Sequence, residues 1–398
     1  MKRDQHVPRE SLWRRGERFV RTFTADVDKD DVERLFQEDA RRAFDVLVRD
    51  QSPKEDTDEL TRFLHDTRRF FLGLSFKLSP ARRLLFAACL LLPLVGLIQI
   101  EATLGPTEVS VDASPFLFLF SLGGLVLLLA LEMVDRLRVR DELDIARELQ
   151  RELLPDHVPP LSGYRVAHAY QTANEIGGDY YDVIELDDGR IVLTVGDASG
   201  HGIGAGLLMA IANATLKTAV DLDERPAAAL DLLNRVLYRT GTKRAFMTLF
   251  YGVLEPESGR FDYACAGHPF PFLRRANGQV EELGSGSLPL GMRAQLDIPT
   301  GQTVIEPGDL LVLYTDGLPE AIGGPRGAEG SNIETFGFHR LQNLVAAVPP
   351  ARTEDSPKRL HDQILQAVSV HRRGMPLADD LTLMVVARRQ DQAKPAAA

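Results

Sequence analysis

The sequence predicts an α+β protein in which antiparallel sheets, with helices packed outside them, follow a helical region and a membrane hairpin. Short runs rich in β-branched and aromatic residues start near Tyr164, are bounded by Gly, Pro and Asp, and mostly follow one another in series. That order favours antiparallel sheets over a Rossmann alternation of strand and helix. Upstream of these runs, two uncharged apolar segments of 17 residues each predict helices that cross a membrane.

The first 80 residues predict a helical region. Apolar residues recur at helical spacing in residues 32–47 and again in residues 60–74, which indicates two amphipathic helices. Three arrangements are open for these helices: they pack on each other, lie on the membrane surface or contact a partner protein. The sequence does not choose among the three.

Residues 81–134 predict a transmembrane hairpin, with helices at about 84–100 and 115–132. Many charged residues precede the first apolar run, which excludes a cleaved signal peptide. The alternative of two buried core helices is disfavoured, because both runs are apolar on all faces. Basic residues flank the outer ends of the hairpin, whereas the connecting loop holds only acidic ones, so both ends are predicted to face the cytoplasm.

Residues 135–155 predict a linker helix that leaves the membrane. The stretch from Glu132 to Leu154 contains no Gly or Pro, and Pro155 ends the helix. A homodimer along helix 132–154 is a hypothesis, because the apolar repeat covers barely two heptads. A second hypothesis is that this helix passes a change in the hairpin to the strand that bears Asp179.

Residues 156–389 predict the α+β domain, and residues 390–398 a disordered tail. The main strands are predicted at 165–170, 180–186, 191–196, 246–254, 260–266 and 309–314. Helices are predicted at 205–220, 226–239, 338–347 and 357–370.

Composition limits the possible functions. The chain has 398 residues, of which 44% are apolar, so a single small module is excluded. After Arg83 there are 40 acidic residues against 27 basic ones, and we find no basic patch. An acidic domain repels a phosphate backbone, so we expect no nucleic-acid partner. Cys89 and Cys265 have no metal-ligand spacing and predict neither a disulfide framework nor a zinc site.

Four acidic clusters lie at turns beside predicted strands. They contain Asp179, Asp197, Asp316, and the adjacent pair Asp379 and Asp380. Each cluster alone is typical of a turn. Four clusters without basic partners nearby in the sequence indicate a site where cations neutralise the carboxylates, which would otherwise repel one another. Oxygen ligands without His or Cys favour Mg²⁺ or Mn²⁺.

These clusters belong to an ordered series of motifs that resembles the bacterial SpoIIE and RsbU-type PP2C (PPM) serine/threonine phosphatases. The motifs are LQRELLP at 149–155, GGDYYD at 177–182, GDASGHG at 196–202, AGHP at 266–269, LPLG at 288–291, YTDG at 314–317 and DDLT at 379–382. The resemblance covers roughly residues 145–388. It implies a PPM-type αββα sandwich with two Mn²⁺ or Mg²⁺ ions at one end. Together with the hairpin, it implies a multi-pass protein of the bacterial inner membrane, with the N-terminus and the phosphatase domain in the cytoplasm.

The resemblance also implies roles for individual residues. The metal ligands that it implies are Asp179, Asp197, Asp316, Asp379 and the backbone carbonyl of Ala198. Asp380 is a further candidate for the metal role, because the sequence does not separate two adjacent carboxylates. Two cations lower the pKa of a water molecule so that it attacks phosphorus, a step to which Asp197 and Asp316 are central. No further cofactor-binding residues are expected.

Two histidines and a serine need separate interpretation. His201 is a candidate proton donor to the leaving serine oxygen, because histidine titrates near neutral pH; a role in fixing its turn is the alternative. His268, between Gly267 and Pro269, is interpreted as a structural turn histidine. Ser199 is not expected to be a nucleophile, because no acid orients the neighbouring histidine.

The predicted function is metal-dependent removal of phosphate from serine or threonine of a protein by a membrane-anchored enzyme. By the resemblance, the substrate is a STAS-type anti-sigma-factor antagonist, and the other expected contact is membrane lipid. The rival hypothesis is a catalytically silent membrane-anchored scaffold with the same fold. The presence of all four matching aspartates argues against it.

Overall fold

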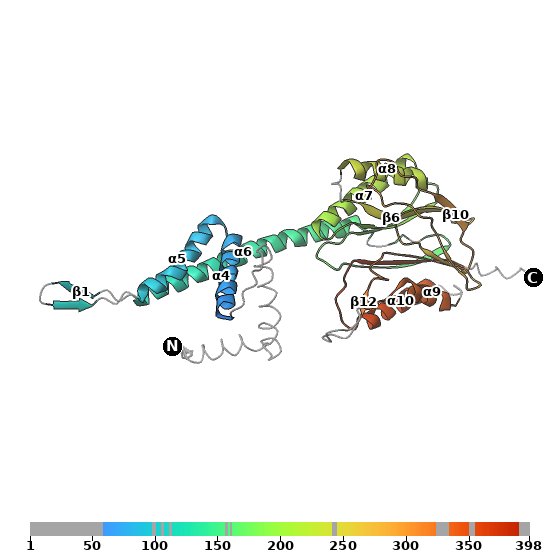
Figure 1. The fold of residues 1–398 in the computed structure, drawn as a ribbon. Helices are drawn as coiled ribbons and strands as arrows, with labels where there is room; N and C mark the ends of the chain where they lie inside the picture. The colour runs from blue at the N-terminus through green and yellow to red at the C-terminus, as the bar shows by residue number, and fades with distance from the viewer. Residues whose placement is uncertain are drawn as a thin grey trace, which may run out of the picture. The chain divides into compact units, whose positions relative to one another are not determined.

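The computed structural model describes residues 59–97, 101–104, 107–110, 114–155, 158–159, 161–240, 245–323, 334–349 and 355–389. The helix predicted at 32–47 and the tail predicted at 390–398 lie outside these residues. The chain divides into two compact units, Met1–Leu137 and Arg138–Ala398. Helix α6 (Ser114–Leu153) runs through the boundary between them without interruption (Figure 1).

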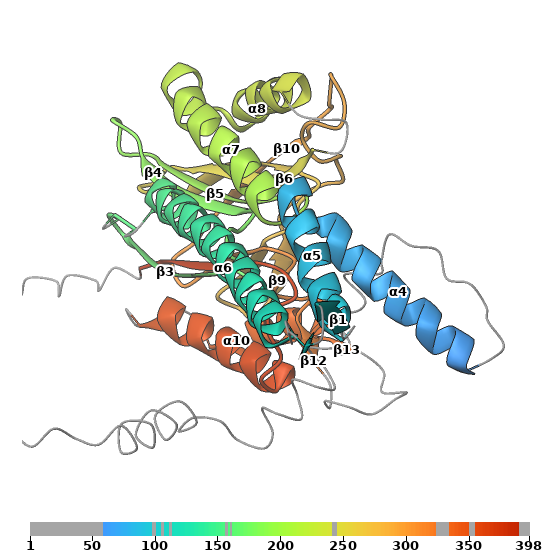
Figure 2. The ribbon, with the colours of Figure 1, turned by 90° about the vertical axis from the view of Figure 1, so that its left-hand side faces the viewer.

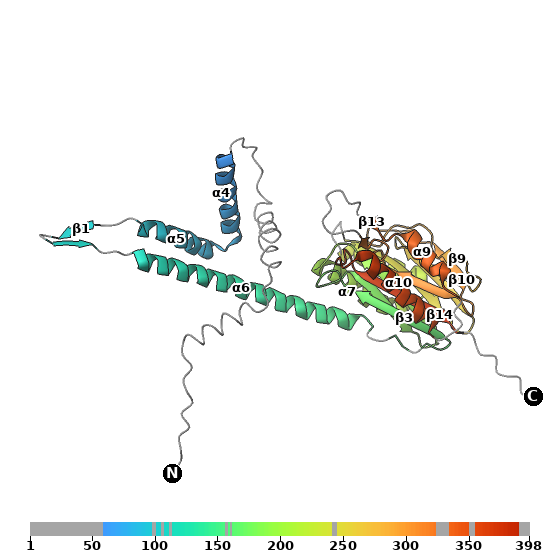
Figure 3. The ribbon, with the colours of Figure 1, turned by 90° about the horizontal axis from the view of Figure 1, so that it is seen from below.

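The first unit contains a helical hairpin. Its elements are α4 (Glu59–Lys77), α5 (Pro80–Gly96), β1 (Glu101–Leu104), β2 (Thr107–Ser110) and the first part of α6. The two short strands pair antiparallel in the connection that joins α5 to α6, and these two helices lie side by side (Figure 3). Gly124 of α6 permits close packing, because a Cβ there would lie 2.3 Å from Sγ of Cys89 on α5. Ser121 Oγ donates a hydrogen bond to the Cys89 carbonyl at 2.6 Å.

Helix α6 exposes large apolar side chains along the stretch predicted to cross a membrane. Leu119, Phe120 and Leu129 are 67%, 70% and 63% exposed. By length and composition, α6 and α7 (Ile203–Leu222) are the helices of the described residues that pass a simple test for membrane crossing. Helix α7 packs on two strands of the second unit and buries one face, as the core helix of a soluble domain does. Helix α5 extends the predicted 84–100 helix at its start and ends earlier, at Gly96.

The second unit is a sandwich of two five-stranded antiparallel sheets. The first sheet has the order β10-β7-β6-β5-β4, and the second has the order β3-β14-β11-β8-β9. Helices α7 and α8 cover the first sheet, and α9 and α10 cover the second (Figures 1 and 2). The αββα fold predicted from the sequence is therefore confirmed.

The sandwich is built from the following elements. The first sheet contains β4 (Asp179–Glu185), β5 (Ile191–Ala198), β6 (Met247–Leu254), β7 (Arg260–Ala266) and β10 (Thr300–Val304). The second contains β3 (Tyr164–Gln171), β8 (Phe272–Arg274), β9 (Val280–Glu282), β11 (Leu310–Tyr314) and β14 (Leu381–Arg388). The remaining elements are α8 (Pro226–Thr240), α9 (Phe338–Ala347), α10 (Ser356–Arg372) and the small pair β12 (Ile322–Gly323) and β13 (Glu334–Thr335).

Strand β11 shows how the core is divided. Leu311 and Leu313 point into the apolar layer between the two sheets, whereas Leu310, Val312 and Tyr314 point into the layer beneath α9 and α10. Successive side chains of a strand face opposite sides, so a strand covered on both faces must be apolar throughout. This explains why residues 310–314 form a continuous apolar run.

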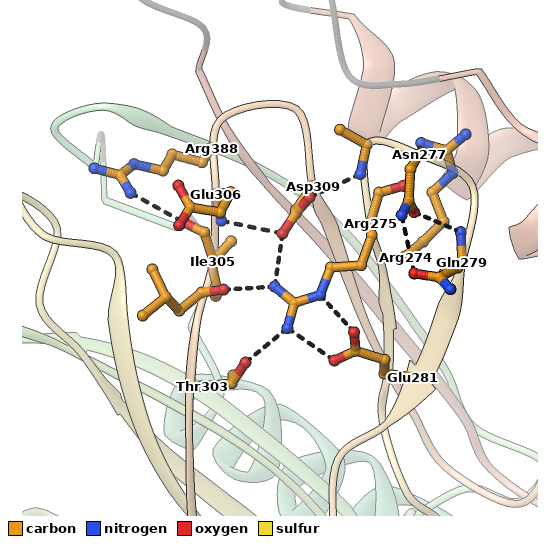
Figure 4. A network of polar contacts seen from close by, with 12 residues as sticks. Arg274, Arg275, Asn277, Gln279, Glu281, Thr303, Ile305, Glu306, Asp309 and Arg388 are labelled. Carbon is orange, nitrogen blue, oxygen red and sulfur yellow. Dashed lines mark hydrogen bonds and ion pairs between the residues drawn. The ribbon is translucent and has the colours of Figure 1, made fainter.

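Arg275 joins the two sheets at the end of β11 that is remote from Asp316 (Figure 4). Its guanidinium donates to both carboxylate oxygens of Glu281 in the second sheet, each at 2.8 Å. It also donates to Thr303 Oγ1 and to the Val304 carbonyl of the first sheet, at 2.9 and 2.6 Å. A further bond, at 3.0 Å, reaches the buried carboxylate of Asp309 just before β11. The rigid fork of arginine suits such a network.

Candidate metal centre

Strand pairing gathers the predicted aspartates at one end of the sandwich. Asp179 begins β4 and lies directly opposite Asp197 in the register of β4 with β5. Asp316 follows the end of β11, and the adjacent pair Asp379 and Asp380 immediately precedes β14. Because β11 and β14 are antiparallel, the end of one and the start of the other meet at the same edge.

Asp179 links the two sheets through its buried carboxylate. Its Oδ2 accepts hydrogen bonds from the hydroxyls of Thr315 at 2.7 Å and Thr382 at 2.6 Å, both from the second sheet or its edge. Its Oδ1 is buried and has no hydrogen-bond partner among the described residues. Burial, and then the charge of Asp197, raise the pKa of Asp179 well above its ordinary value. An unpartnered buried oxygen in this position suits a cation or a proton.

The adjacent carboxylates Asp379 and Asp380 differ sharply in surroundings. Asp380 is buried, and its oxygens accept hydrogen bonds from the backbone N–H groups of Ala173 at 2.7 Å and Gly178 at 2.5 Å. Burial raises the pKa of Asp380, and these two bonds oppose that rise. Asp379 is exposed, and its Oδ1 accepts a bond from the backbone N–H of Asp380 at 2.8 Å. Asp380 therefore ties the two sheets together, while Asp379 remains accessible.

The site carries concentrated negative charge. Burial, followed by the charges of Asp316 and Asp379, raises the pKa of Asp197 to about 8. Burial, followed by the charges of Asp379 and Glu320, raises the pKa of Asp316 to about 6. Within the described part of the chain, no lysine or arginine forms an ion pair with these aspartates. Uncompensated carboxylates of this kind favour cation binding.

The donor set suits hard divalent cations, although the carboxylates do not form a closed cage. No group of three or more His, Cys, Asp or Glu side chains in the described residues is close enough to hold a metal ion. The lack of a side chain at Gly178 nevertheless leaves space beside two oxygens, because a Cβ there would lie 2.9 Å from the Ala198 carbonyl oxygen and 3.3 Å from Asp197 Oδ1. These oxygens and the unpartnered Oδ1 of Asp179 are donors of the kind that Mn²⁺ and Mg²⁺ prefer.

Comparison with known proteins identifies the domain. The profile of the family described as Stage II sporulation protein E (SpoIIE) matches residues 187–389, which is half of the chain. The chain belongs to the SpoIIE family. The match contains Asp197, Asp316, Asp379 and Asp380, while Asp179 lies just before it.

Relatives of the SpoIIE-family domain come from several bacteria. Protein IcfG of Synechocystis sp. is 26% identical over 298 residues, covering 68% of this chain and 45% of that protein. Phosphoserine phosphatase RsbU of Bacillus subtilis is 27% identical over 252 residues, covering 63% of this chain and 71% of that protein. The solved SiaA-PP2C domain of Pseudomonas aeruginosa has a TM-score of 0.55 and 21% identity, covering 65% of this chain and 99% of that domain. This last likeness shows that the fold is of the PP2C type.

His201 and Ser199 lie in the turn between β5 and α7 of the SpoIIE-family domain. His201 is exposed, and Gly200 and Gly202 on either side of it have positive φ of 96° and 67°. Those values favour glycine and give the turn its shape. Ser199 Oγ accepts a hydrogen bond from the Phe246 backbone N–H at 2.9 Å, which gives it a structural function.

Sequence reasoning missed several residues that organise the site. Thr315 and Thr382, which hold Asp179, lie within the motifs YTDG and DDLT, and this position was the available signal. Gln150 near the end of α6 clasps Gly177: its Nε2 donates to the Gly177 carbonyl at 2.6 Å, and its Oε1 accepts from the Gly177 N–H at 3.1 Å. The linker helix thus contacts the segment that leads into Asp179.

Proposed function

We propose that the SpoIIE-family domain hydrolyses phosphoserine or phosphothreonine on a protein substrate, with two Mn²⁺ or Mg²⁺ ions at the acidic end of the sandwich. The observation that carries the proposal is the gathering of carboxylates with raised pKa and without basic partners at one edge of both sheets. The name of the relative RsbU, phosphoserine phosphatase, supports the choice of substrate group. The resemblance to the SpoIIE and RsbU-type phosphatases favours a STAS-type anti-sigma-factor antagonist as the protein that carries the phosphate.

The residues of the site have separable functions in this proposal. Asp197, Asp316, Asp379 and the Ala198 carbonyl would hold the cations, and Asp179 would contribute its unpartnered Oδ1. When bound, the cations supply an activated water molecule and neutralise charge on the phosphoryl oxygens. The threonine hydroxyls fix the orientation of Asp179, so that carboxylates from both sheets keep their spacing.

Two finer roles belong to the same proposal. Asp380 acts through the backbone: it holds Gly178 in place with a carboxylate that is already occupied, which leaves Asp379 as the ligand of the pair. His201 is exposed four residues after Asp197 and is the candidate donor of a proton to the leaving oxygen. An unchanged dependence of turnover on pH in His201→Asn would assign His201 to the turn alone.

We further propose that α5 and α6 anchor the chain in the bacterial inner membrane, with both ends of the hairpin in the cytoplasm. The exposure of large apolar residues on the faces of α6 that do not pack on α5 supports a lipid environment over a protein core. Arg82 forms ion pairs with Glu132 at 2.8 Å and Asp135 at 2.6 Å. In the proposed orientation these charged groups lie at the cytoplasmic end of the hairpin. A homodimer through helix 132–154 would cover Val139, Ile145 and Leu149, which are more than half exposed.

The decisive experiment measures Mn²⁺-dependent hydrolysis of p-nitrophenyl phosphate by the full chain in detergent. The matched variants are Asp197→Asn and Asp316→Asn, which keep side-chain size and remove the charge. We expect both to lose activity by several orders of magnitude. Activity that survives both substitutions would refute the two-metal proposal, and a wild-type chain without activity would favour the scaffold. The phosphoprotein retained by a trapping Asp197→Asn variant would identify the substrate.

A further inference from the structure

The buried imidazole of His268 bridges the two sheets at the acidic end of the sandwich. The chain leaves the first sheet at Ala266 and enters the second at Phe272, and His268 lies on this crossing with 4% of its surface exposed. Its Nδ1 is 2.9 Å from Thr248 Oγ1, and its Nε2 is 3.1 Å from the Tyr314 carbonyl. A carbonyl can only accept, so Nε2 carries the proton and Nδ1 accepts from the threonine hydroxyl.

Both partners of the ring are close in sequence or register to proposed metal ligands. Thr248 on β6 lies directly opposite Asp197 on β5, and its Oγ1 is 3.5 Å from the Asp197 carbonyl. Tyr314 is the last residue of β11, and Asp316 follows two positions later. One ring therefore connects the strand beside Asp197 to the strand that leads into Asp316.

The backbone around the ring is itself fixed. Cys265 Sγ donates to the His268 carbonyl at 3.2 Å. Gly267 has a positive φ of 65°, and a Cβ at that position would lie 2.6 Å from the ring of Pro289. Burial lowers the pKa of His268 to about 3, so the ring remains neutral and keeps one donor and one acceptor at physiological pH.

We propose that His268 is a positioning residue: it sets the spacing between Asp197 and Asp316 and thereby the affinity of the site for divalent cations. This inference rests on the proposed function. Ligands must be held to within about 0.5 Å of the productive geometry, and a rigid ring bonded on both sides achieves this better than packing alone. The rival explanation is that His268 only stabilises the fold, as Arg275 does at the other end of the same two sheets.

The test measures Mn²⁺ affinity by calorimetric titration of MnCl₂ into the full chain in detergent. Separately, the stability of each variant is measured by unfolding it in EDTA, without metal. The variants are His268→Gln, which keeps polarity but cannot hold both bonds, and Thr248→Val, which removes one bond with little change in size. Thr248→Ser is the matched variant that keeps the hydroxyl. Arg275→Ala is the control, because it breaks the Arg275 network that joins the two sheets far from the site. Residues that support metal ligands alter metal affinity by about 10–100-fold when they are removed.

We expect Mn²⁺ binding about 10–100-fold weaker in His268→Gln and Thr248→Val, near-normal binding in Thr248→Ser, and turnover that recovers at high Mn²⁺. Arg275→Ala should lose stability but bind Mn²⁺ within about twofold of the wild type. If His268→Gln does not fold, Thr248→Val and Thr248→Ser decide the matter. Lower stability with unchanged Mn²⁺ affinity in both His268→Gln and Thr248→Val would overturn the positioning role. A wild-type chain that binds no Mn²⁺ would instead overturn the proposed function, and this inference with it.

Discussion

Removing the negative charge of Asp197 should stabilise the metal-free protein at high pH. Burial, then the charges of Asp316 and Asp379, raise the pKa of Asp197 from 3.8 to about 8 in the folded chain. Between these two pH values the folded state binds a proton that the unfolded state has released. Without metal, stability therefore falls as the pH rises from about 4 to about 8. Asparagine does not titrate, so Asp197→Asn avoids this loss.

The size of the effect follows from the same values. A rise of the Asp197 pKa from 3.8 to about 8 corresponds to an upper bound of about 6 kcal/mol. A protein interior weakens the interaction between charges more than a dry medium of low dielectric constant does, so the real effect is smaller than this bound. We expect Asp197→Asn to be more stable than the wild type by about 1–3 kcal/mol at pH 8. The difference should vanish near pH 3, below the ordinary value of 3.8, where the carboxyl of Asp197 is protonated in the folded state and largely so in the unfolded state.

The assay is hydrogen–deuterium exchange of the peptides that carry β5 and β14, in EDTA, at several pH values. Exchange of core strands reports the free energy of opening without requiring the membrane helices to unfold. Addition of Mn²⁺ should reverse the order, because the wild type gains binding energy that Asp197→Asn has lost. An Asp197→Asn chain that is less stable than the wild type in EDTA at pH 8 would refute the reasoning.

Three further predictions concern neighbouring residues. Asp380→Asn should lower the free energy of unfolding by about 1–3 kcal/mol, because one buried backbone N–H loses its acceptor. Asp379→Asn should leave stability nearly unchanged and weaken Mn²⁺ binding in calorimetry. Equal effects of the two variants on stability and on Mn²⁺ binding would contradict separate roles. Gly317→Ala should reduce both stability and Mn²⁺ affinity, because its Cβ would lie 1.9 Å from the Asp380 carbonyl oxygen and would displace residues 379–380. A crystal structure of this variant in which residues 379–380 have not moved would disprove the prediction. Inserting two residues at Arg147 turns the two ends of α6 by roughly 200° relative to each other and should change phosphatase activity, whereas four residues, about one turn, should not; an unchanged rate with two would exclude coupling.

Much of the fold follows from local pattern. The continuous apolar run at 310–314 predicted a buried strand, and helices α7 to α10 begin and end close to their predicted bounds. In the two sheets, strands β8, β9 and β10 were not predicted. Strand β8 has only three residues, and β9 and β10 are short and carry exposed polar residues, so their pairing partners determine these strands more than their own sequence.

The candidate site was predictable only in part. The clusters around Asp197 and Asp316 stand out because each follows an apolar strand and adjoins glycine. Sequence could not separate Asp379 from Asp380, since the difference between them is tertiary: the backbone of Gly178 reaches only the second carboxylate. The bridging function of His268 was also invisible, because its two partners lie 20 and 46 positions away.

The double burial of β11 has a consequence for how the protein can evolve. Its side chains are enclosed from both directions, so a polar replacement at any of the five positions would be trapped away from water. Strand β10, whose residues alternate between exposed and half-covered, has an outer row that can drift freely. Distant homologues of this protein should therefore keep aliphatic or aromatic residues at positions 310–314 even where the exposed positions of 300–304 have diverged completely.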